Sequence, residues 1–210
     1  VAKFGGRQSV GGTLYAINSD GTGFRVLHEF TAPSTEGFYP HAAPILYEEF
    51  LYGTTYHGGE KKDGGVLYRY SLPDGPFEVL HGFTPETGRH PTGQLTIVDG
   101  WLYGTTSDLF RHEEEQYGTL FRFHPGKRSY EVLHRFDGGD EGAHPYDRLS
   151  HFGGEYLYGT TYGEIFNPAR KGTLFRLHRE SGEHEVLHAF AKHPGTGSKP
   201  NGHLVEGPEG

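Results

Sequence analysis

Apolar and polar residues alternate over short segments of this chain, and glycine or proline bounds each segment. In the segment 130–136, Val132, His134 and Phe136 fall on one side of an extended chain and the residues between them on the other. Such segments are too short and too closely bounded by glycine for helices. The pattern therefore predicts strands and an all-β fold.

Three motifs recur along these segments. Leu-Tyr-Gly-Thr-Thr begins at residues 51, 102 and 157. Each copy precedes a glycine-containing loop, then Gly-(Thr or Val)-Leu-(Phe or Tyr)-Arg, then Glu-Val-Leu-His-x-Phe. A spacing of about 50 residues in an all-β chain is typical of a β-propeller with one blade per repeat. We expect four strands per repeat, which in the middle copy cover 94–98, 101–106, 118–123 and 130–136.

The two ends of the chain look like complementary parts of one further repeat. Residues 12–30 carry the second and third motifs, but no Leu-Tyr-Gly precedes them, and residues 18–23 form a turn signal between two strands. The last residues, 199–210, resemble a first strand with nothing after it. Pairing 204–206 with the N-terminal repeat would leave no open edge between the first and last blades.

The fold expected from these patterns is a four-bladed β-propeller with four antiparallel strands per blade, in one domain over residues 1–210. Its blades are expected at about 39–83, 90–136 and 144–190, with the fourth formed by 1–30 plus 199–210.

The three motifs, followed by a Gly-x-x-Pro segment, resemble the GloVer tandem repeat of bacterial, often surface-anchored proteins. The resemblance covers essentially the whole chain. It implies propeller blades and an extracellular or cell-surface location. The chain departs from the pattern in the Leu-Tyr-Gly missing from the first repeat and in the unlike loops after each Thr-Thr.

Composition narrows the classes of partner. The chain has 210 residues, a formal net charge of −8 and no cysteine, and its pI is about 6.0. An acidic chain is a poor partner for nucleic acid, and its like charge favours a soluble monomer. No apolar run approaches the roughly 18 residues of a spanning helix, so we expect no membrane insertion. No signal peptide is visible, so we expect any such segment to have been removed or to lie outside this sequence.

Residues that recur in every repeat are expected to serve the fold. A histidine follows Val-Leu in all four copies of the third motif, and four histidines could suggest a ring of metal ligands. Because the outer strands of a propeller lie far apart, we expect each histidine to hydrogen-bond within its own blade and to hold no metal. The four are His28, His81, His134 and His188.

Residues that do not recur are expected to carry function. Blade topology places two sets of loops on one face: the loops after Leu-Tyr-Gly-Thr-Thr and the segments that contain the prolines. The first set covers 3–11, 56–64, 107–117 and 162–171. The second set contains Pro40, Pro91, Pro145 and Pro200.

The proline segments offer aromatic rings that can stack on sugars and polar groups that can bind hydroxyls or carboxylates. The hypothesis is a secreted or surface module that binds a carbohydrate or another extracellular ligand at the mouth of a central channel. The expected ligand-binding residues are Tyr39, His41, His90, Gln94, His144, Tyr146, Arg148, Asn201 and His203.

Two alternatives remain open. A polysaccharide lyase acting on uronic-acid glycans could use His144, Tyr146 and Arg148, with the arginine neutralising the carboxylate and the other two moving protons. The other is a protein-interaction or assembly module. No signature motif of an enzyme is present, so we lean away from an enzyme.

No cofactor is expected. Acidic residues at 113–115 and at Asp137, Asp140 and Glu141 could meet Ca²⁺. No spacing matches a calcium loop, so a solvated charge run is the favoured interpretation.

Overall fold

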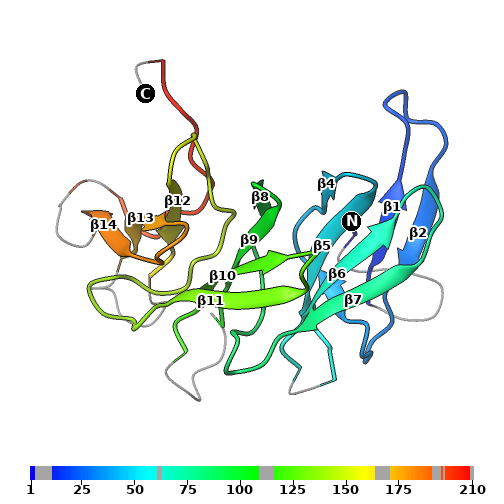
Figure 1. Ribbon diagram of the computed structural model, residues 1–210, viewed down its shortest axis with the longest axis horizontal. Coiled ribbons are helices and arrows are strands. Elements are labelled where there is room, and N and C mark those ends of the chain that lie inside the picture. The colour runs from blue at the N-terminus through cyan, green and yellow to red at the C-terminus, as the bar shows by residue number, and fades with distance from the viewer. Residues whose placement is uncertain are drawn as a thin grey trace. The chain divides into compact units, whose positions relative to one another are not determined.

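The structure, a computed structural model, describes residues 1–2, 11–60, 63–108, 116–163, 171–190, 195 and 197–208. The chain divides into two units, Val1–Gln94 and Leu95–Gly210 (Figure 1). All the named elements are strands, and the part of the chain that the structure describes contains no α-helix. The all-β prediction is confirmed.

Unit 1 contains a two-stranded and a five-stranded antiparallel sheet. In the second sheet, β3 and β4 pair with different parts of β5, which continues to β6 and β7. The strands are β1 (Thr13–Ala16), β2 (Arg25–Glu29), β3 (Phe38–Pro40), β4 (Ile45–Tyr47), β5 (Phe50–His57), β6 (Val66–Ser71) and β7 (Phe77–Gly82). The predicted turn between β1 and β2 is present, with the Gly21 N–H donating to the Asn18 carbonyl at 2.9 Å.

Unit 2 contains a four-stranded sheet in the order β11-β10-β9-β8 and a three-stranded sheet in the order β12-β13-β14. The strands are β8 (Thr96–Val98), β9 (Trp101–Thr106), β10 (Thr119–His124), β11 (Ser129–Arg135), β12 (Tyr156–Thr161), β13 (Thr173–His178) and β14 (His184–Ala189). The four strands predicted in the middle repeat are therefore present, and β9 has the predicted bounds.

The first strands of the other two full repeats differ: β4 has three residues, as β8 does, whereas the last full repeat has no first strand among the described residues. In the last full repeat only bridges remain, between Ser150 and Tyr158 and between Pro145 and Thr161. The segment 204–206, predicted as an inner strand, has no strand assignment, and Leu204 instead exchanges hydrogen bonds with the Ser150 side chain. Closure of four blades and a single domain over 1–210 stay predictions.

Residues 1–2 occupy the position of the Thr-Thr pair of the full repeats. Ala2 forms a bridge with Thr13, as Thr55 pairs with Val66 in the next repeat. The incomplete first repeat therefore retains the end of its second strand.

One feature of every repeat was not predicted. The ladder between the last two strands shifts register at the same place in each of them: between Leu14 and Tyr15, Leu67 and Tyr68, Leu120 and Phe121, and Leu174 and Phe175. In the middle repeat Leu120 pairs with His134 and Phe121 with Val132, so Leu133 is the extra residue of a β-bulge. Bulges increase local twist, and this one interrupts the simple alternation expected for 130–136.

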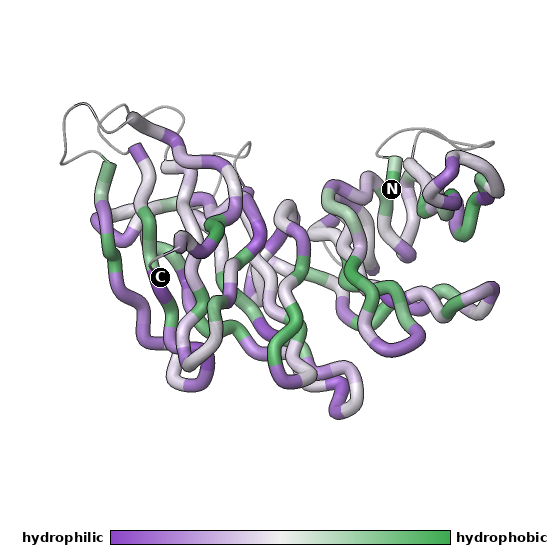
Figure 2. Tube along the Cα trace, turned by 90° about the horizontal axis from the view of Figure 1, so that it is seen from above, coloured by the Kyte–Doolittle hydropathy of each residue, from purple (hydrophilic) through white to green (hydrophobic). Residues whose placement is uncertain are grey.

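The glycine of Leu-Tyr-Gly is explained by the strand beside it. In three repeats an aromatic ring of the neighbouring strand lies against this glycine, so that an added Cβ would be far inside van der Waals contact; the pairs are Gly53 with Tyr68, Gly104 with Phe121 and Gly159 with Phe175. Phe121 and Phe175 are fully buried, and the core of unit 2 continues from Phe175 to Leu149, Leu157 and Leu177. The tube view shows such apolar stretches alternating with hydrophilic turns (Figure 2).

The repeated arginine is held in the same way in all three full repeats. Its guanidinium lies 4.3–4.5 Å from the centre of the aromatic ring that precedes Leu-Tyr-Gly. Its Nε–H donates to the glutamate of the third motif at 2.6–2.9 Å. The sets are Phe50, Arg69 and Glu78; Trp101, Arg122 and Glu131; and Tyr156, Arg176 and Glu185.

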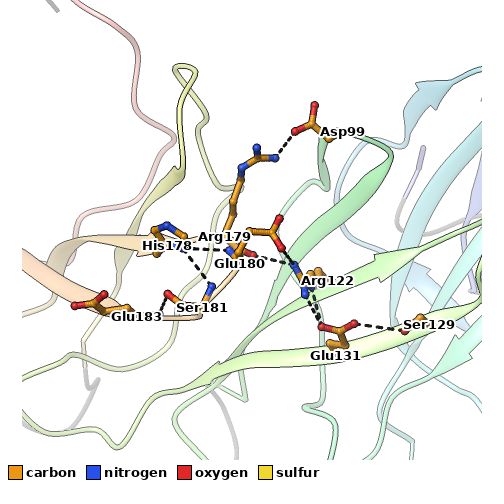
Figure 3. Close-up of polar contacts among 9 residues, drawn as sticks. All are labelled: Asp99, Arg122, Ser129, Glu131, His178, Arg179, Glu180, Ser181 and Glu183. Carbon is orange, nitrogen blue, oxygen red and sulfur yellow. Dashed lines mark hydrogen bonds and ion pairs between the residues drawn. The ribbon is translucent and has the colours of Figure 1, made fainter.

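Figure 3 shows the polar contacts of Arg122, including its contact with Glu131. Arg122 also donates to the Arg179 carbonyl at 3.0 Å and lies 3.2 Å from the Glu180 carboxylate. Arg179 in turn forms an ion pair with Asp99. These contacts join consecutive repeats of unit 2 through the turns, so the arginine serves the fold.

The repeated histidines also make local contacts. Each ring meets the edge of the phenylalanine two residues later, with centroids 4.8–5.2 Å apart. His28 also stacks on Phe77 at 3.9 Å. The Nε2 of His28 is buried, has no hydrogen-bond partner among the described residues and lies 3.7 Å from Glu36, so the predicted hydrogen bond is not found at this nitrogen. Ring packing therefore accounts for much of the placement of this histidine.

The close packing at Gly104 yields a prediction. Gly104→Ala should lower the free energy of unfolding by about 1–3 kcal/mol, because the new methyl group must displace the buried Phe121 ring. Gly82→Ala is the matched control, since nothing lies within 4 Å of the position of its Cβ. Urea unfolding of both variants measures the difference, and equal stabilities would contradict the explanation of the motif.

Burial lowers the pKa of His81 from its ordinary value of 6.5 to about 4. The unfolded chain therefore binds more protons at this residue between these two values, and folding stability is lost as the pH falls through that window. Allowing for partial exposure, we expect wild type to lose about 2 kcal/mol more than His81→Gln between about pH 7 and pH 4. Unfolding at both pH values measures this, and parallel losses in the two proteins would show that His81 does not contribute.

Candidate binding surface

One backbone hydrogen bond recurs in all four repeats and brings the two predicted loop sets together. The residue before each repeated proline, called here the pre-proline residue, donates its N–H to the last residue of a loop in the first set. The bonds run from Tyr39 to Gly11 at 2.7 Å, from His90 to Gly64 at 2.8 Å, from His144 to Tyr117 at 2.7 Å and from Lys199 to Lys171 at 2.6 Å. The two loop sets therefore meet within each unit, and their placement on one face of a propeller stays a prediction.

The pre-proline residues have an unusual backbone. Their φ angles are 58°, 57°, 58° and 55° at Tyr39, His90, His144 and Lys199. Glycine adopts this left-handed conformation most easily, yet each repeat places a large side chain there. Strain of this kind persists only where the surrounding structure enforces it. The fold thus fixes four large side chains beside the loops.

In unit 1 the pre-proline histidine meets an aromatic ring of the first loop set. Tyr56 lies between His41 of its own repeat, at 6.1 Å, and His90 of the next, on which it stacks at 4.5 Å with 12° between the planes. His57 lies 5.2 Å from His90 and 5.7 Å from Tyr39. His90 is 1% exposed, whereas the other four are partly exposed. We call these five residues the Tyr56 cluster.

Asp63 fixes the loop that carries this cluster. Its Oδ1 accepts the Gly58 N–H at 2.7 Å, and its Oδ2 lies 3.0 Å from His57 Nδ1. Its backbone carbonyl lies 3.0 Å from His90 Nε2, which must be the donor because a carbonyl only accepts. Both histidines are therefore oriented by one residue, and the cluster is held in place before any ligand arrives.

Unit 2 repeats this arrangement with other side chains. Tyr162, at the position of Tyr56, lies 6.4 Å from Tyr146 of its own repeat. The ammonium group of Lys199 lies 5.3 Å from the centre of the Tyr162 ring, where His90 stacks in unit 1. These three residues form the Tyr162 cluster. A lysine over an aromatic face is a cation–π contact, which leaves its other donors available to water or ligand.

The remaining full repeat lacks the aromatic ring. Ser107 stands at the position of Tyr56 and Tyr162, and it is fully buried. Its neighbours by position, Thr92 and His144, are 3% and 8% exposed. The repeats therefore share the backbone but differ in what they present.

A family model described as the Gloeobacter/Verrucomicrobia repeat matches residues 1–165. The chain belongs to this repeat family. The match includes the incomplete first repeat and the Tyr56 cluster, and it ends within the last full repeat. The predicted resemblance is confirmed.

Solved structures share the fold at low identity. A puromycin-hydrolysing peptidase of Mycobacterium tuberculosis is 18% identical with a TM-score of 0.50; the match covers 80% of this chain and 23% of that one. A structure from a study of two prolyl endopeptidases is 12% identical with a TM-score of 0.51, covering 85% of this chain and 25% of that one. This repeat protein thus spans about a quarter of either chain. No curated protein matches its sequence.

Other predicted site residues of this repeat protein differ in their exposure. Gln94 and Arg148 are partly buried, and the Arg148 N–H donates to the Asp147 carboxylate at 2.7 Å. Asn201 and His203 are exposed. Residues 3–10, 61–62, 109–115 and 164–170 of the loops, including the acidic run 113–115, lie outside the described residues.

One of the residues suggested for a lyase, Tyr146, is poorly suited to accept a proton. Burial, with a contribution from Tyr162, raises the pKa of Tyr146. A tyrosine that accepts a proton must ionise readily, so its environment opposes this role. Tyr146 is better suited to donate a hydrogen bond.

The acidic residues suggested for Ca²⁺ also have other contacts. Asp137 Oδ1 accepts the Gly139 N–H at 2.7 Å, and Glu141 lies 3.2 Å from the His134 Nε2. Asp140 is exposed.

Tyr56, His57, Asp63 and Tyr162 were missed as site residues, although their loops were expected on the binding face. The signal was available, because Tyr56 and Tyr162 follow Leu-Tyr-Gly-Thr-Thr directly at the point where the repeats diverge.

A pocket of about 560 Å³ lies along the same loop of unit 1. This volume is in the range of small-molecule sites. Its lining is mixed and includes two carboxylates and several apolar strand residues. It comprises Thr35, Glu36, Gly59, Glu60, Val66, Val79, Leu80, His81, Gly82, Thr84 and Thr87. The loop 56–64 thus contributes both to the Tyr56 cluster and to a recess.

The described residues form no helix that is long and apolar enough to cross a membrane.

Proposed function

We propose that this chain is a secreted or cell-surface binding module that takes a carbohydrate on its Tyr56 and Tyr162 clusters. The observation that carries the proposal is the recurrence of one arrangement with different side chains. In both units a partly exposed tyrosine ring stands between a side chain of its own repeat and the pre-proline side chain of the next.

The chemistry of the clusters suits sugars. A tyrosine ring offers a flat apolar face against which the C–H face of a sugar can lie, and its hydroxyl bonds at the edge. His41 in unit 1, and Tyr146 and Lys199 in unit 2, supply hydrogen-bonding groups beside that plane. A few polar groups around an apolar surface are what specific small-ligand sites use.

The rigidity of the Tyr56 cluster supports the same proposal. Asp63 holds the loop through three contacts, and the His90 backbone is bonded to Gly64. A ligand that meets ordered side chains loses less of its binding energy to ordering them. The Tyr56 cluster is therefore the stronger of the two proposed sites.

The four repeats, we further propose, close into a four-bladed β-propeller. The support lies in unit 2, where one kind of contact recurs between the first segments of consecutive repeats. The Thr96 hydroxyl donates to the Leu149 carbonyl of the next repeat, and the Ser150 hydroxyl, one repeat on, donates to the Leu204 carbonyl at 2.9 Å. Leu204 thus stands where the inner strand of a further blade would begin, and the incomplete N-terminal repeat lacks such a strand.

The binding proposal predicts retention of the protein on immobilised glycans. In a panel of neutral and uronic-acid glycans, at least one should retain wild type, and Tyr56→Ala should weaken that retention by about tenfold or more, because stacking energy is lost. Tyr162→Ala tests the second cluster in the same way. Phe24→Ala is the control, since Phe24 is an aromatic residue that is 61% exposed on a hairpin outside both clusters.

The same samples separate the rival functions. Ultraviolet absorbance from new unsaturated sugar ends, lost in Arg148→Ala, would show a lyase and contradict a simple binding module. Absence of both retention and absorbance would leave the interaction module as the better account.

Closure predicts a strong effect of shortening the chain. Removing residues 199–210 should expose a strand edge, so we expect the truncated protein to aggregate. Its melting temperature should fall by several degrees, because each 2 kcal/mol of unfolding free energy lost lowers it by roughly 4 °C or more in a chain of this size. Val205→Ala, at a residue that is 80% exposed, is the control for sequence changes in this segment. An unchanged melting temperature after the truncation would refute closure.

A further inference from the structure

Three potential metal donors meet beside the outer strands of unit 2. His134 lies on β11, Glu141 lies in the connection after it, and His184 begins β14 (Figure 1). Each residue offers one donor atom, and all three atoms lie within 4.8 Å of one another. The His134 Nε2 and the Glu141 carboxylate are 3.2 Å apart, and the rings of His134 and His184 stack at 4.3 Å.

The imidazole of His184 is poorly satisfied. Both of its ring nitrogens are buried, and neither has a hydrogen-bond partner among the residues that the structure describes. Its ring is also packed against Phe136 and Phe175. Buried polar groups are normally bonded, so an orphaned pair of nitrogens calls for a missing partner.

Unit 1 contains the same arrangement without the third donor. His28 stacks on Phe77 at 3.9 Å with 7° between the planes, and its Nε2 lies 3.7 Å from Glu36. Phe77 and His184 both stand at the start of the last strand of their repeats. A histidine close to a glutamate is therefore present in both units. His184 stands where unit 1 has Phe77, whose ring needs no hydrogen-bond partner. A polar substitution at such a place is unfavourable unless something binds it.

We propose that His134, Glu141 and His184 form a site for a divalent first-row transition cation of the zinc type. Two imidazoles and one carboxylate are a donor set that such cations prefer over Ca²⁺ or Mg²⁺. Zinc sites place these atoms at about 2.0–2.2 Å from the ion, so small side-chain rotations would bring the three donors onto it. The Glu141 side chain is 43% exposed and gives the ion a path from solvent.

Calorimetric titration of the full chain with ZnCl₂ tests the site, using protein freed of any polyhistidine tag and of metal. We expect one ion per chain. His184→Phe restores the ring of the sister repeat, so it should fold while its affinity falls by about tenfold or more, and Glu141→Gln should also weaken binding. His151→Gln should bind as wild type does, because His151 lies outside the cluster and bonds to Gly154.

Further measurements keep the test independent of folding defects. Circular dichroism reports whether His184→Phe is folded, and the visible spectrum of Co²⁺ in wild type should show nitrogen and oxygen ligands. Phe77→His completes the three-donor set in unit 1 and should add a second ion. No uptake by wild type, uptake unchanged in folded His184→Phe, or no gain in Phe77→His would overturn the proposal. So would loss of the ion in Asp63→Asn, which would place it at His57, Asp63 and His90.

Discussion

The hydrogen bond from each pre-proline N–H to the loop of the preceding repeat is the contact on which the candidate surface depends. It joins consecutive repeats at the same point four times, with lengths of 2.6–2.8 Å. It also requires a left-handed backbone at a residue that is not glycine. Because the bond is backbone to backbone, the side chain at that position is free to differ among tyrosine, histidine and lysine. The same backbone arrangement therefore presents a different side chain in different repeats.

The same division between frame and variable groups runs through the rest of the chain. Phe121 covers Gly104, and Arg122 is held by Trp101 and Glu131, in an arrangement that returns in each full repeat. These residues bury apolar surface or satisfy charge, so they explain why the motifs recur. Where one repeat differs from the others, as at His184 or Lys199, the fold of the sister repeats does not require the residue that stands there. Such departures are the best guide to function in this family of repeats.

Much of the frame could be predicted from the sequence, because strand periodicity and turn residues are local signals. The bounds of β9 and the turn at 18–23 follow from them directly. The bulge opposite Leu120 could not be predicted, because register depends on how two strands pair. The pairing of Tyr56 with His90 was also out of reach, since it depends on two loops from different repeats meeting in space. Nothing in the sequence marks His184 as a metal-ligand candidate, because only the structure shows that its ring stacks on His134.

The central claim is that divergent side chains at the pre-proline links form the binding surface. Hydrogen exchange of the protein with and without the glycan that it retains best tests this claim most directly. The account predicts slowed exchange of backbone amides around residues 39–41, 56–60 and 90, around 146, 162 and 199, or in both regions. It predicts no change in the outer strands β7 and β11. Protection confined to those outer strands, or no protection anywhere, would contradict the account.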